Sequence, residues 1–457
     1  MYKTFLSWRY MRRRKTNIIG IVGIGVGVGA LILILSIMSG FLEETKKTLR
    51  GGLSDLIIEP TQLPRQDGVV VPYSPEPVLE VVRADPRVKA ACAQLGWFGI
   101  VAQGGRRAAV TGVRMSDVQS GSLAGVQLLG IDVQDEFQTT ELRKALERES
   151  LVGADRVANL DRPFDPPPDW EPKGLPLASV VVGERLANDW RLSRGSEIEI
   201  VTTVPNLKSK ELKPYNRSFV VAGTFRSGEN EADAHCIYMD RRELADFLGP
   251  PRTFSQVLVK LKNYDRDART MREELRIQLA KKGLIRTDDD YGEVRTWEEF
   301  KKTLLGAIEN ERVLMAIMLS LVVIVAAFTI FAILSMMVTE KRRDIGILTA
   351  LGATPGGVTA LFLLIGFWDT LVGASGGAVL GMWAAYKIDA IERWLSSTFH
   401  VQIFDRSVYL FDHIPAIVNP LWVAVIVLGA FVVALLFALV PAFKAGRLHP
   451  LDALRYE

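Results

Sequence analysis

Few side chains in this sequence have the types and spacing that covalent chemistry needs. A nucleotide-binding loop requires a glycine frame before its Lys-Ser/Thr pair, and the Lys-Thr pairs at 15–16, 47–48 and 302–303 lack that frame. The four histidines, at 235, 400, 413 and 449, show no metal-ligand spacing, and no His-Glu-x-x-His occurs. We therefore expect no catalytic residue, metal or cofactor on this chain.

The polar residue that stands out is Asp369, the single charge in a long apolar stretch. Gly373, Gly377 and Gly381 follow it at four-residue spacing, and small residues at this spacing let two helices approach closely in lipid. A carboxylate at such a depth is costly unless it faces protein or water. We predict helix packing along this stripe, with Asp369 paired with a neighbouring helix or close to an interface. Four more glycines form similar pairs: Gly23 with Gly27, and Gly25 with Gly29.

A short charged segment lies between two apolar stretches and runs Glu340, Lys341, Arg342, Arg343, Asp344. Ile345, Leu348 and Leu351 follow at spacings of three, which predicts one apolar helical face. Gly352 suits the position after a helix, and Thr354 with Pro355 suits the start of the next one. We predict a short charged helix. The alternative is a solvated loop whose positive charges orient the neighbouring spans.

The elements around these residues are four apolar stretches, 18–42, 313–339, 345–386 and 414–443, of which only the third holds a charge. A bilayer core about 30 Å thick needs about 20 apolar residues in a helix. Buried helices of a soluble protein rarely run so long without a polar face. The sequence therefore predicts four transmembrane helices, the first too long for a cleaved signal peptide. Lys3 and five further basic residues up to Lys15 precede the first span without an acidic residue, which predicts cytoplasmic termini.

The rest of the chain divides around these spans. The net charge of +3, from 55 basic and 52 acidic residues, argues against a nucleic-acid binder and a disordered chain, and two cysteines exclude a disulfide scaffold. Whether Cys92 and Cys236 pair is open. The predicted segments are 1–17 basic N-terminal helix, 18–42 span one, 43–312 outer domain, 313–339 span two, 340–355 charged helix, 356–386 span three, 387–413 outer loop, 414–443 span four and 444–457 tail.

The outer domain is predicted to be α+β. Short β-branched runs predict strands at 69–71, 180–182, 197–201, 219–222 and 257–261, and helices are expected at 241–248, 265–282 and 296–312. A proline-rich patch, 163–176, is read as an exposed loop, junction or insertion. We expect two lobes: one contiguous, about 160–260, and one formed by the flanks 43–159 and 261–312.

Several blocks in the same order resemble a known family, the lipoprotein-releasing ABC permeases LolC and LolE. They include Met336 to Thr354, the stretch Leu35-Ser36-Ile37-Met38-Ser39-Gly40-Phe41, the run Val182-Gly183-Glu184-Arg185-Leu186-Ala187, and the loop Tyr409 to Pro415. Further similarity lies in 192–196, 297–331 and the C-terminus from Pro441. The resemblance covers most of the chain and is weakest over 60–175.

This resemblance implies an α-helical membrane protein with four transmembrane helices and a large α+β periplasmic domain, the type VII, MacB-like ABC permease fold. It implies a multi-pass protein of the bacterial inner membrane, paired with a second permease subunit, the same or homologous, and with a LolD-like ATPase that holds ATP and Mg. The implied task is lipoprotein extraction and transfer to a periplasmic LolA-like carrier. The alternatives are a MacB-like mechanotransmission permease for efflux or envelope signalling, and a non-transporting membrane sensor.

Three sites are expected on this basis. The segment from Glu340 to Gly352 is expected to dock on the ATPase. An apolar cavity for acyl chains is expected at the outer ends of spans one and two, at Met38, Phe41, Val313 and Ile317; the alternative is that these side chains simply face lipid. A carrier-binding hook is expected in the basic loop 203–217, flanked by strands and exposed because prolines suit edges that do not pair further. Its expected contact residues are Pro205, Leu207, Lys208, Lys210, Lys213, Pro214 and Tyr215; the alternative is a solvated hairpin without a partner.

Overall fold

The computed structural model describes residues 7, 15–59, 74–102, 123–150, 153–168, 170–171, 177–205, 212–249, 253–285, 294–399 and 413–448. The chain forms two compact units. The helical unit comprises residues 1–44, 304–404 and 413–457, and the sheet domain comprises 45–303 and 405–412. Most of the predicted N-terminal segment 1–17, the loop 400–412 and the last nine residues lie outside the described residues.

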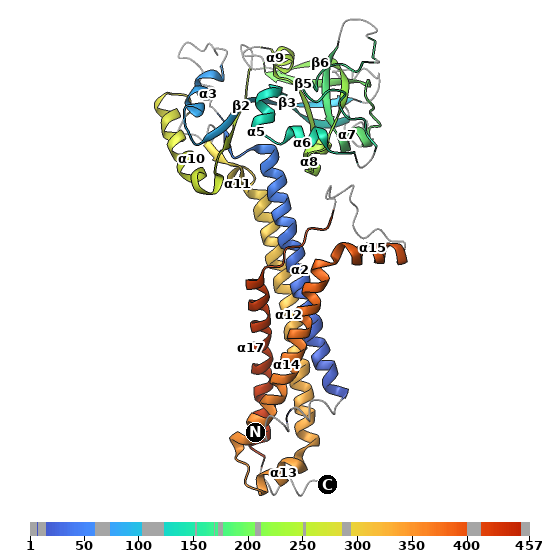
Figure 1. Ribbon diagram of the computed structural model, residues 1–457, viewed down its shortest axis with the longest axis vertical. Coiled ribbons are helices and arrows are strands. Elements are labelled where there is room, and N and C mark those ends of the chain that lie inside the picture. Colours follow the sequence, from blue (N-terminus) through green and yellow to red (C-terminus); the bar gives the residue numbers. More distant parts are fainter. Residues whose placement is uncertain are drawn as a thin grey trace. The chain divides into compact units, whose positions relative to one another are not determined.

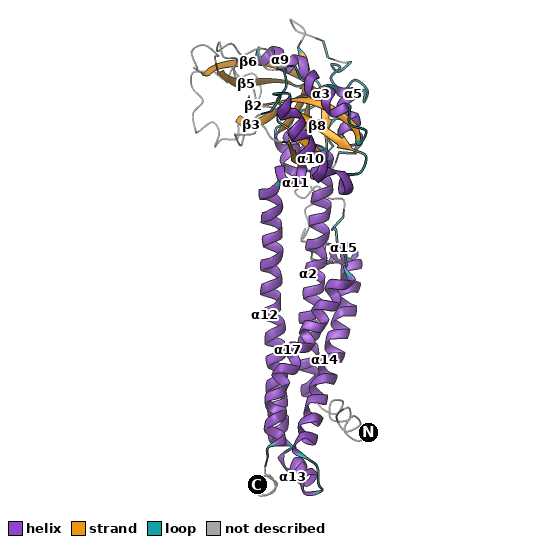
Figure 2. Cartoon of the chain, turned by 90° about the vertical axis from the view of Figure 1, so that its left-hand side faces the viewer, coloured by secondary structure: helices purple, strands orange, loops and turns teal. Residues whose placement is uncertain are grey.

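The helical unit contains four long helices, which run alongside one another (Figures 1 and 2). They are α2 (Lys15–Leu53), α12 (Lys302–Glu340), α14 (Pro355–Tyr386) and α17 (Pro420–Gly446). All four are long and apolar enough to cross a membrane. Two of them are longer than the predicted spans, since α2 runs on to Leu53 and α12 begins at Lys302. The predicted start of span four at residue 414 is wrong: α17 begins at Pro420, because Asn419 caps the helix and Pro420 suits its first position. Two shorter helices, α13 (Arg342–Ala350) and α15 (Ile388–Phe399), follow α12 and α14.

The core of the helical unit is built from small and branched side chains. Ala430, Ala434, Ala438 and Ala442 line one side of α17 and are buried with Val358, Phe362 and Ile365 of α14 and with residues of α2 and α12. The four-residue spacing of these alanines places small side chains along one side of α17, so this helix can pack closely against its neighbours. Such close packing drives helix association in lipid, where the hydrophobic effect does not.

The sheet domain is built on one mixed nine-stranded sheet, in the order β3-β7-β4-β6-β5-β2-β8-β1-β9. The strands are β1 (Leu56–Ile58), β2 (Val88–Ala102), β3 (Leu123–Ile131), β4 (Ala178–Gly183), β5 (Glu197–Pro205), β6 (Leu212–Phe225), β7 (Cys236–Asp240), β8 (Gln256–Leu261) and β9 (Val294–Thr296). The helices are α3 (Glu76–Arg83), α5 (Val133–Thr139), α6 (Leu142–Glu147), α7 (Glu184–Asp189), α8 (Asn230–His235), α9 (Arg241–Leu248), α10 (Tyr264–Lys281) and α11 (Trp297–Phe300).

Most of the predicted elements are present. The runs 180–182, 197–201, 219–222 and 257–261 lie in β4, β5, β6 and β8, whereas 69–71 lies outside the described residues. Helices α9 and α10 match their predictions. The expected helix 296–312 is divided at Lys301, where α11 ends and α12 begins, and a capping box of Thr296 and Glu299 starts α11.

The division into two lobes differs from the expectation. The long strand β2 contributes Leu95 and Val101 to one core, with β4 to β7, and Ala91 and Ala93 to another, with β1, β8, α3 and α10. Strand β3 pairs with β7, so residues 123–131 belong with the contiguous lobe, whereas β8 pairs with β1 and the first half of β2. The cause is the length of β2, which runs through both lobes. Cys92 and Cys236 are both buried and free, so they form no disulfide.

Candidate functional site

The charged segment after α12 forms the predicted short helix, α13. Gly352, at φ +97°, follows its end, and the amide of Ala353 donates to the carbonyl of Leu348 at 3.0 Å. The amide of Gly352 donates to Thr349, which completes a glycine-terminated helix end. Two residues later, the Thr354 hydroxyl accepts from the amide of Gly357 at 3.2 Å and caps α14. The predicted capping of both helices is therefore confirmed.

The three residues of the predicted apolar face of α13 are not buried together: Ile345 is buried, whereas Leu351 is exposed. Ile345 is 2% exposed and belongs to the core of the helical unit. Ile347 is 45% exposed and Leu351 81% exposed, and Arg343 and Ala350 are exposed beside them. Lys341 forms an ion pair with Asp344 at 2.6 Å. The free face of α13 therefore consists of Arg343, Ile347, Ala350 and Leu351, which we call the α13 outer face.

Glycines bring α2 and α14 into backbone contact. A Cβ at Gly377 would lie 2.3 Å from the carbonyl oxygen of Gly25, and one at Gly381 would lie 2.7 Å from that of Gly29. A Cβ at Gly373 would lie 2.7 Å from the carbonyl oxygen of Ile21. The stripe singled out in the sequence thus packs on α2, and Gly25 with Gly29 is the pair that receives it.

Asp369 lies one turn before this contact and is 3% exposed. Its Oδ1 atom has no hydrogen-bond partner among the described residues. The contacts pair 381 with 29, 377 with 25 and 373 with 21, and if this register continued for one further turn, Asn17 would be level with Asp369. Asn17 is 1% exposed, and neither of its amide atoms has a partner in the described part of the chain. The sequence singled out Asp369 but gave no reason to consider Asn17.

The residues expected to line an acyl cavity lie on two helices, Met38 and Phe41 on α2 and Val313 and Ile317 on α12. Val313 is 48% and Ile317 54% exposed, whereas Met38 and Phe41 are half-buried. A groove at the same end of the helices is lined by other residues, among them Ser39 and Arg312, which neighbour the predicted ones in sequence.

The segment before α17 crosses α2 at Gly40, a contact that sequence reasoning missed. A Cβ at Gly40 would lie 2.5 Å from the backbone of Pro415, and the amide of Ile417 donates to the carbonyl of Ser36 at 2.9 Å. Both segments had been singled out by their resemblance to the family. The glycine within the first block was the available signal, because close backbone approach is one reason for a helical glycine.

The expected hook is a two-stranded ribbon. Strands β5 and β6 pair from Glu197 with Val220 out to Pro205 with Leu212. The expectation that the prolines end the pairing is wrong: Thr203 pairs with Pro214. Among the described residues, β2 pairs with β5 only as far as Val201, and β4 pairs with β6 only from Phe219. Between Val201 and Phe219 the outer edges of the ribbon are therefore unpaired, and a proline, which has no amide hydrogen, is tolerated there. Pro214 and Tyr215 are exposed, only the backbone of Pro205 and Lys213 is described, and Leu207, Lys208 and Lys210 lie outside the described residues.

The sheet domain contains a buried carboxyl group, Glu136 of α5, which is 1% exposed. It accepts hydrogen bonds from Cys92 Sγ at 3.2 Å, Gln94 Nε2 at 3.3 Å and Thr140 Oγ1 at 3.1 Å. Burial, with a smaller contribution from the nearby Asp132 and Asp135, raises the pKa of Glu136 to about 7, although the hydrogen bonds from Cys92 and Thr140 act to lower it. No cation is paired with it among the described ion pairs, so its charged form is the unfavourable one.

This pKa predicts a stability that falls as pH rises. The folded protein holds the Glu136 proton up to about pH 7, whereas the unfolded chain releases it near pH 4.5. The contribution of Glu136 is therefore complete below pH 4.5 and lost as pH passes through 7. We expect Glu136→Gln to be more stable than wild type at pH 8, by up to about 3 kcal/mol, and equal to it at pH 4.5. Thermal unfolding of the full chain at both values tests this, and an equal difference at both would contradict it.

Comparison with protein families identifies the class. The model of the MacB-like periplasmic core domain matches residues 18–276, more than half of the chain, and the model of the FtsX-like permease C-terminal domain matches 316–450. The chain therefore belongs to the MacB/FtsX-like permeases, the transmembrane subunits of ABC transporters with a MacB-like periplasmic domain. The sheet domain is that periplasmic domain.

Within this family the chain is of the LolC/LolE type, as its sequence blocks indicated. The "Lipoprotein-releasing system transmembrane protein LolC" of Neisseria meningitidis serogroup B is 25% identical over 100% of this chain and 99% of its own length. The corresponding LolE protein of Haemophilus influenzae is 21% identical over 98% of each chain. The solved periplasmic region of MacB from Actinobacillus actinomycetemcomitans covers 56% of this chain and 95% of its own at 11% identity and a TM-score of 0.31.

Proposed function

We propose that this chain is the permease subunit of a transporter that extracts lipoproteins from the bacterial inner membrane and passes them to a periplasmic carrier. The observation that carries the proposal is the likeness to LolC proteins along the whole of both chains. The basic N-terminal segment and the basic link at 341–343 support cytoplasmic termini and a cytoplasmic position for α13.

Extraction of a lipid anchor needs an external source of work. Moving an acyl chain of roughly fifteen CH₂ groups out of the bilayer costs on the order of 12 kcal/mol. This chain has no nucleotide-binding loop, so a separate ATPase supplies the work in this proposal. The α13 outer face supports such a contact, because it offers Ile347 and Leu351 as apolar anchors beside the positive charge of Arg343.

The other partners follow from exposed features. The exposed Val313 and Ile317 suit a surface that this subunit shares with a second permease and with the acyl chains of the cargo. The ribbon of β5 and β6 is proposed as the carrier contact, with Pro214 and Tyr215 exposed near the tip. Its tip sequence, 206–213, carries three lysines and one glutamate, so it would attract an acidic rim and increase the association rate.

Two substitutions that place negative charges on the α13 outer face test the proposal. In the transporter reconstituted with its ATPase, Ile347→Asp with Leu351→Asp is expected to weaken ATPase co-purification at least tenfold and to reduce lipoprotein release to background. The reason is that a carboxylate in an apolar contact loses its hydration without a partner. Ile277→Asp is the matched control, since Ile277 is an exposed apolar residue of α10 in the sheet domain, 48% exposed.

The outcomes separate the two parts of the proposal. Normal assembly and release by the double variant would exclude α13 as the ATPase contact. A wild-type complex that binds its ATPase, hydrolyses ATP and releases no lipoprotein to the carrier would exclude the transport function.

A further inference from the structure

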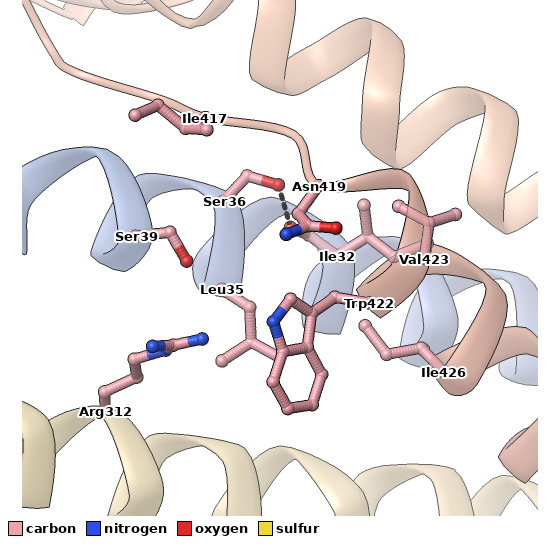
Figure 3. A pocket seen from close by; sticks show the side chains of 10 residues that line it. All are labelled: Ile32, Leu35, Ser36, Ser39, Arg312, Ile417, Asn419, Trp422, Val423 and Ile426. Atoms are coloured by element: carbon pink, nitrogen blue, oxygen red, sulfur yellow. Dashed lines mark hydrogen bonds between the residues drawn. The ribbon is translucent and has the colours of Figure 1, made fainter. Parts of the chain in front are cut away.

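The helical unit contains a groove between α2, α12 and α17 that the proposed function does not use. It is a partly open surface groove whose empty space, about 260 Å³, includes open solvent. Its lining residues are Ile32, Leu35, Ser36, Ser39, Arg312, Ile417, Asn419, Trp422, Val423 and Ile426 (Figure 3). All of them belong to the helical unit.

The groove is polar at one end and aliphatic at the other. Along α2 the lining runs from Ile32 to Ser39, and along α17 it runs in the opposite chain direction from Asn419 to Ile426. Since α2 leads into the periplasmic domain after Ser39, the polar end is the periplasmic end. Seven residues of helix separate Ile32 from Ser39, which makes the groove about 10 Å long.

A single cation lies at the polar end among the lining residues. The Arg312 guanidinium reaches from α12 toward Ser39 and the ring of Trp422, with Cζ 5.6 Å from the ring centroid (Figure 3). Its ion-pair partner is Glu309, one turn earlier, at 3.4 Å, and the Glu309 side chain is 51% exposed. A guanidinium has five N–H donors, so this long contact leaves most of them available for an anion.

We propose that this groove binds one anionic phospholipid of the periplasmic leaflet, with its phosphate at Arg312 and part of one acyl chain along Ile32, Leu35, Val423 and Ile426. The order of polar and aliphatic residues matches the orientation of a lipid in that leaflet. Ser39 and Asn419 add polar groups at the same end. Guanidinium and phosphate form charge-assisted, bidentate hydrogen bonds, which are stronger than bonds between neutral groups.

The preference of the groove for an anionic phospholipid over other lipids must come from the headgroup, which contacts Arg312. The aliphatic floor is no more apolar than the bilayer, so burying a chain there gives no net gain over leaving it in lipid. A lipoprotein anchor carries no phosphate, so the Arg312 guanidinium does not favour it over an anionic phospholipid.

Lipid retention by the full chain in nanodiscs tests the proposal. The nanodiscs contain phosphatidylcholine with a minor fraction of phosphatidylglycerol carrying a spin label, and the fraction of label with restricted motion is measured. We expect Arg312→Gln to reduce the excess of restricted phosphatidylglycerol over phosphatidylcholine at least threefold. We expect Glu309→Gln to increase it, because the competing carboxylate is removed. Lys387→Gln is the control, since Lys387 is an exposed cation at the periplasmic end of α14 and does not line the groove.

The opposite signs of the two groove variants separate binding from misfolding, because a variant that merely disturbs the helices cannot increase selective retention. Equal retention in Arg312→Gln and wild type would overturn the proposal, as would a decrease with Glu309→Gln. A triacylated lipopeptide is added in a further arm. If it displaces phosphatidylglycerol from wild type, the groove takes the cargo anchor instead, and the phospholipid assignment is wrong. The site does not depend on the proposed transport function.

Discussion

Gly377→Ala is expected to destabilise the helical unit, although it adds a single methyl group. The new Cβ would lie 2.3 Å from the carbonyl oxygen of Gly25 and 2.9 Å from its Cα, so the backbones of α2 and α14 must move apart. Backbone atoms cannot turn away as a flexible side chain can. We expect a loss of about 2 kcal/mol or more, at the upper end of overpacking effects. Unfolding of the full chain in mixed detergent–SDS micelles, followed by tryptophan fluorescence, measures it.

The neighbouring glycine provides the control. A Cβ at Gly376 would meet nothing within 4 Å, and Gly376 is exposed. Because alanine favours a helix over glycine by up to about 1 kcal/mol, Gly376→Ala is expected to leave stability unchanged or slightly raised. If the two variants lose stability equally, the close contact between α2 and α14 is not what stabilises the unit.

Glu184→Ala is expected to have a comparably large effect in the periplasmic domain. The Glu184 and Arg226 side chains are 4% and 8% exposed, and Arg226 Nε lies 3.8 Å from Glu184 Oε2. Glu184 also accepts from Ser150, and Arg226 donates to the carbonyl of Glu149 at 3.1 Å. Removing the carboxylate takes one negative charge away from a buried guanidinium, at a cost of about 3–5 kcal/mol. For a domain of this size that corresponds to a fall in Tm of roughly 10 °C.

Two further variants identify the cause. Arg185→Ala changes the next residue, whose ion pair with Asp189 is long, at 3.7 Å, and exposed, so a loss under about 1 kcal/mol is expected. The double variant Glu184→Leu with Arg226→Met replaces the pair by apolar groups and is expected to recover most of the stability. A double variant as unstable as Glu184→Ala would show that the loss of the Glu184 charge beside Arg226 is not the cause.

The spans and three strands of the contiguous lobe, β4, β5 and β6, were predictable because their signals are local, whereas β3 and β7 were not predicted. A charge-free stretch longer than the bilayer thickness admits few structures other than a helix. The β-branched runs of β4 and β6 likewise indicate buried strands. Strand β2 was missed because its sequence, with Gly96, Gly99 and several alanines, has no β-branched run or clear alternation. Its length is set by its neighbours in the sheet, and the predicted boundary between the lobes was wrong for the same reason.

The face of α13 shows why a spacing rule alone is insufficient. Residues at 345, 348 and 351 step by three, and each step falls about 60° short of a full turn of the helix. The set therefore spreads over about 120°, with Ile345 at one edge facing the core. Arg343, Ile347 and Leu351 step by four and lie on the opposite side, as their exposure shows. Which side faces the bundle depends on packing against other helices, and a single sequence does not contain that information.

The connections on either side of α13 are short and hydrogen-bonded. One residue, Lys341, separates it from α12, and the amide of Lys341 still donates to the carbonyl of Met337. On the other side, Ala353 is hydrogen-bonded back to Leu348, and Thr354 is already the cap of α14. A linker of flexible residues would absorb a displacement by changing its own torsion angles. Here the hydrogen-bonded connections provide no such linker, so a displacement of α13 would be passed on to α12 and α14 rather than absorbed between them.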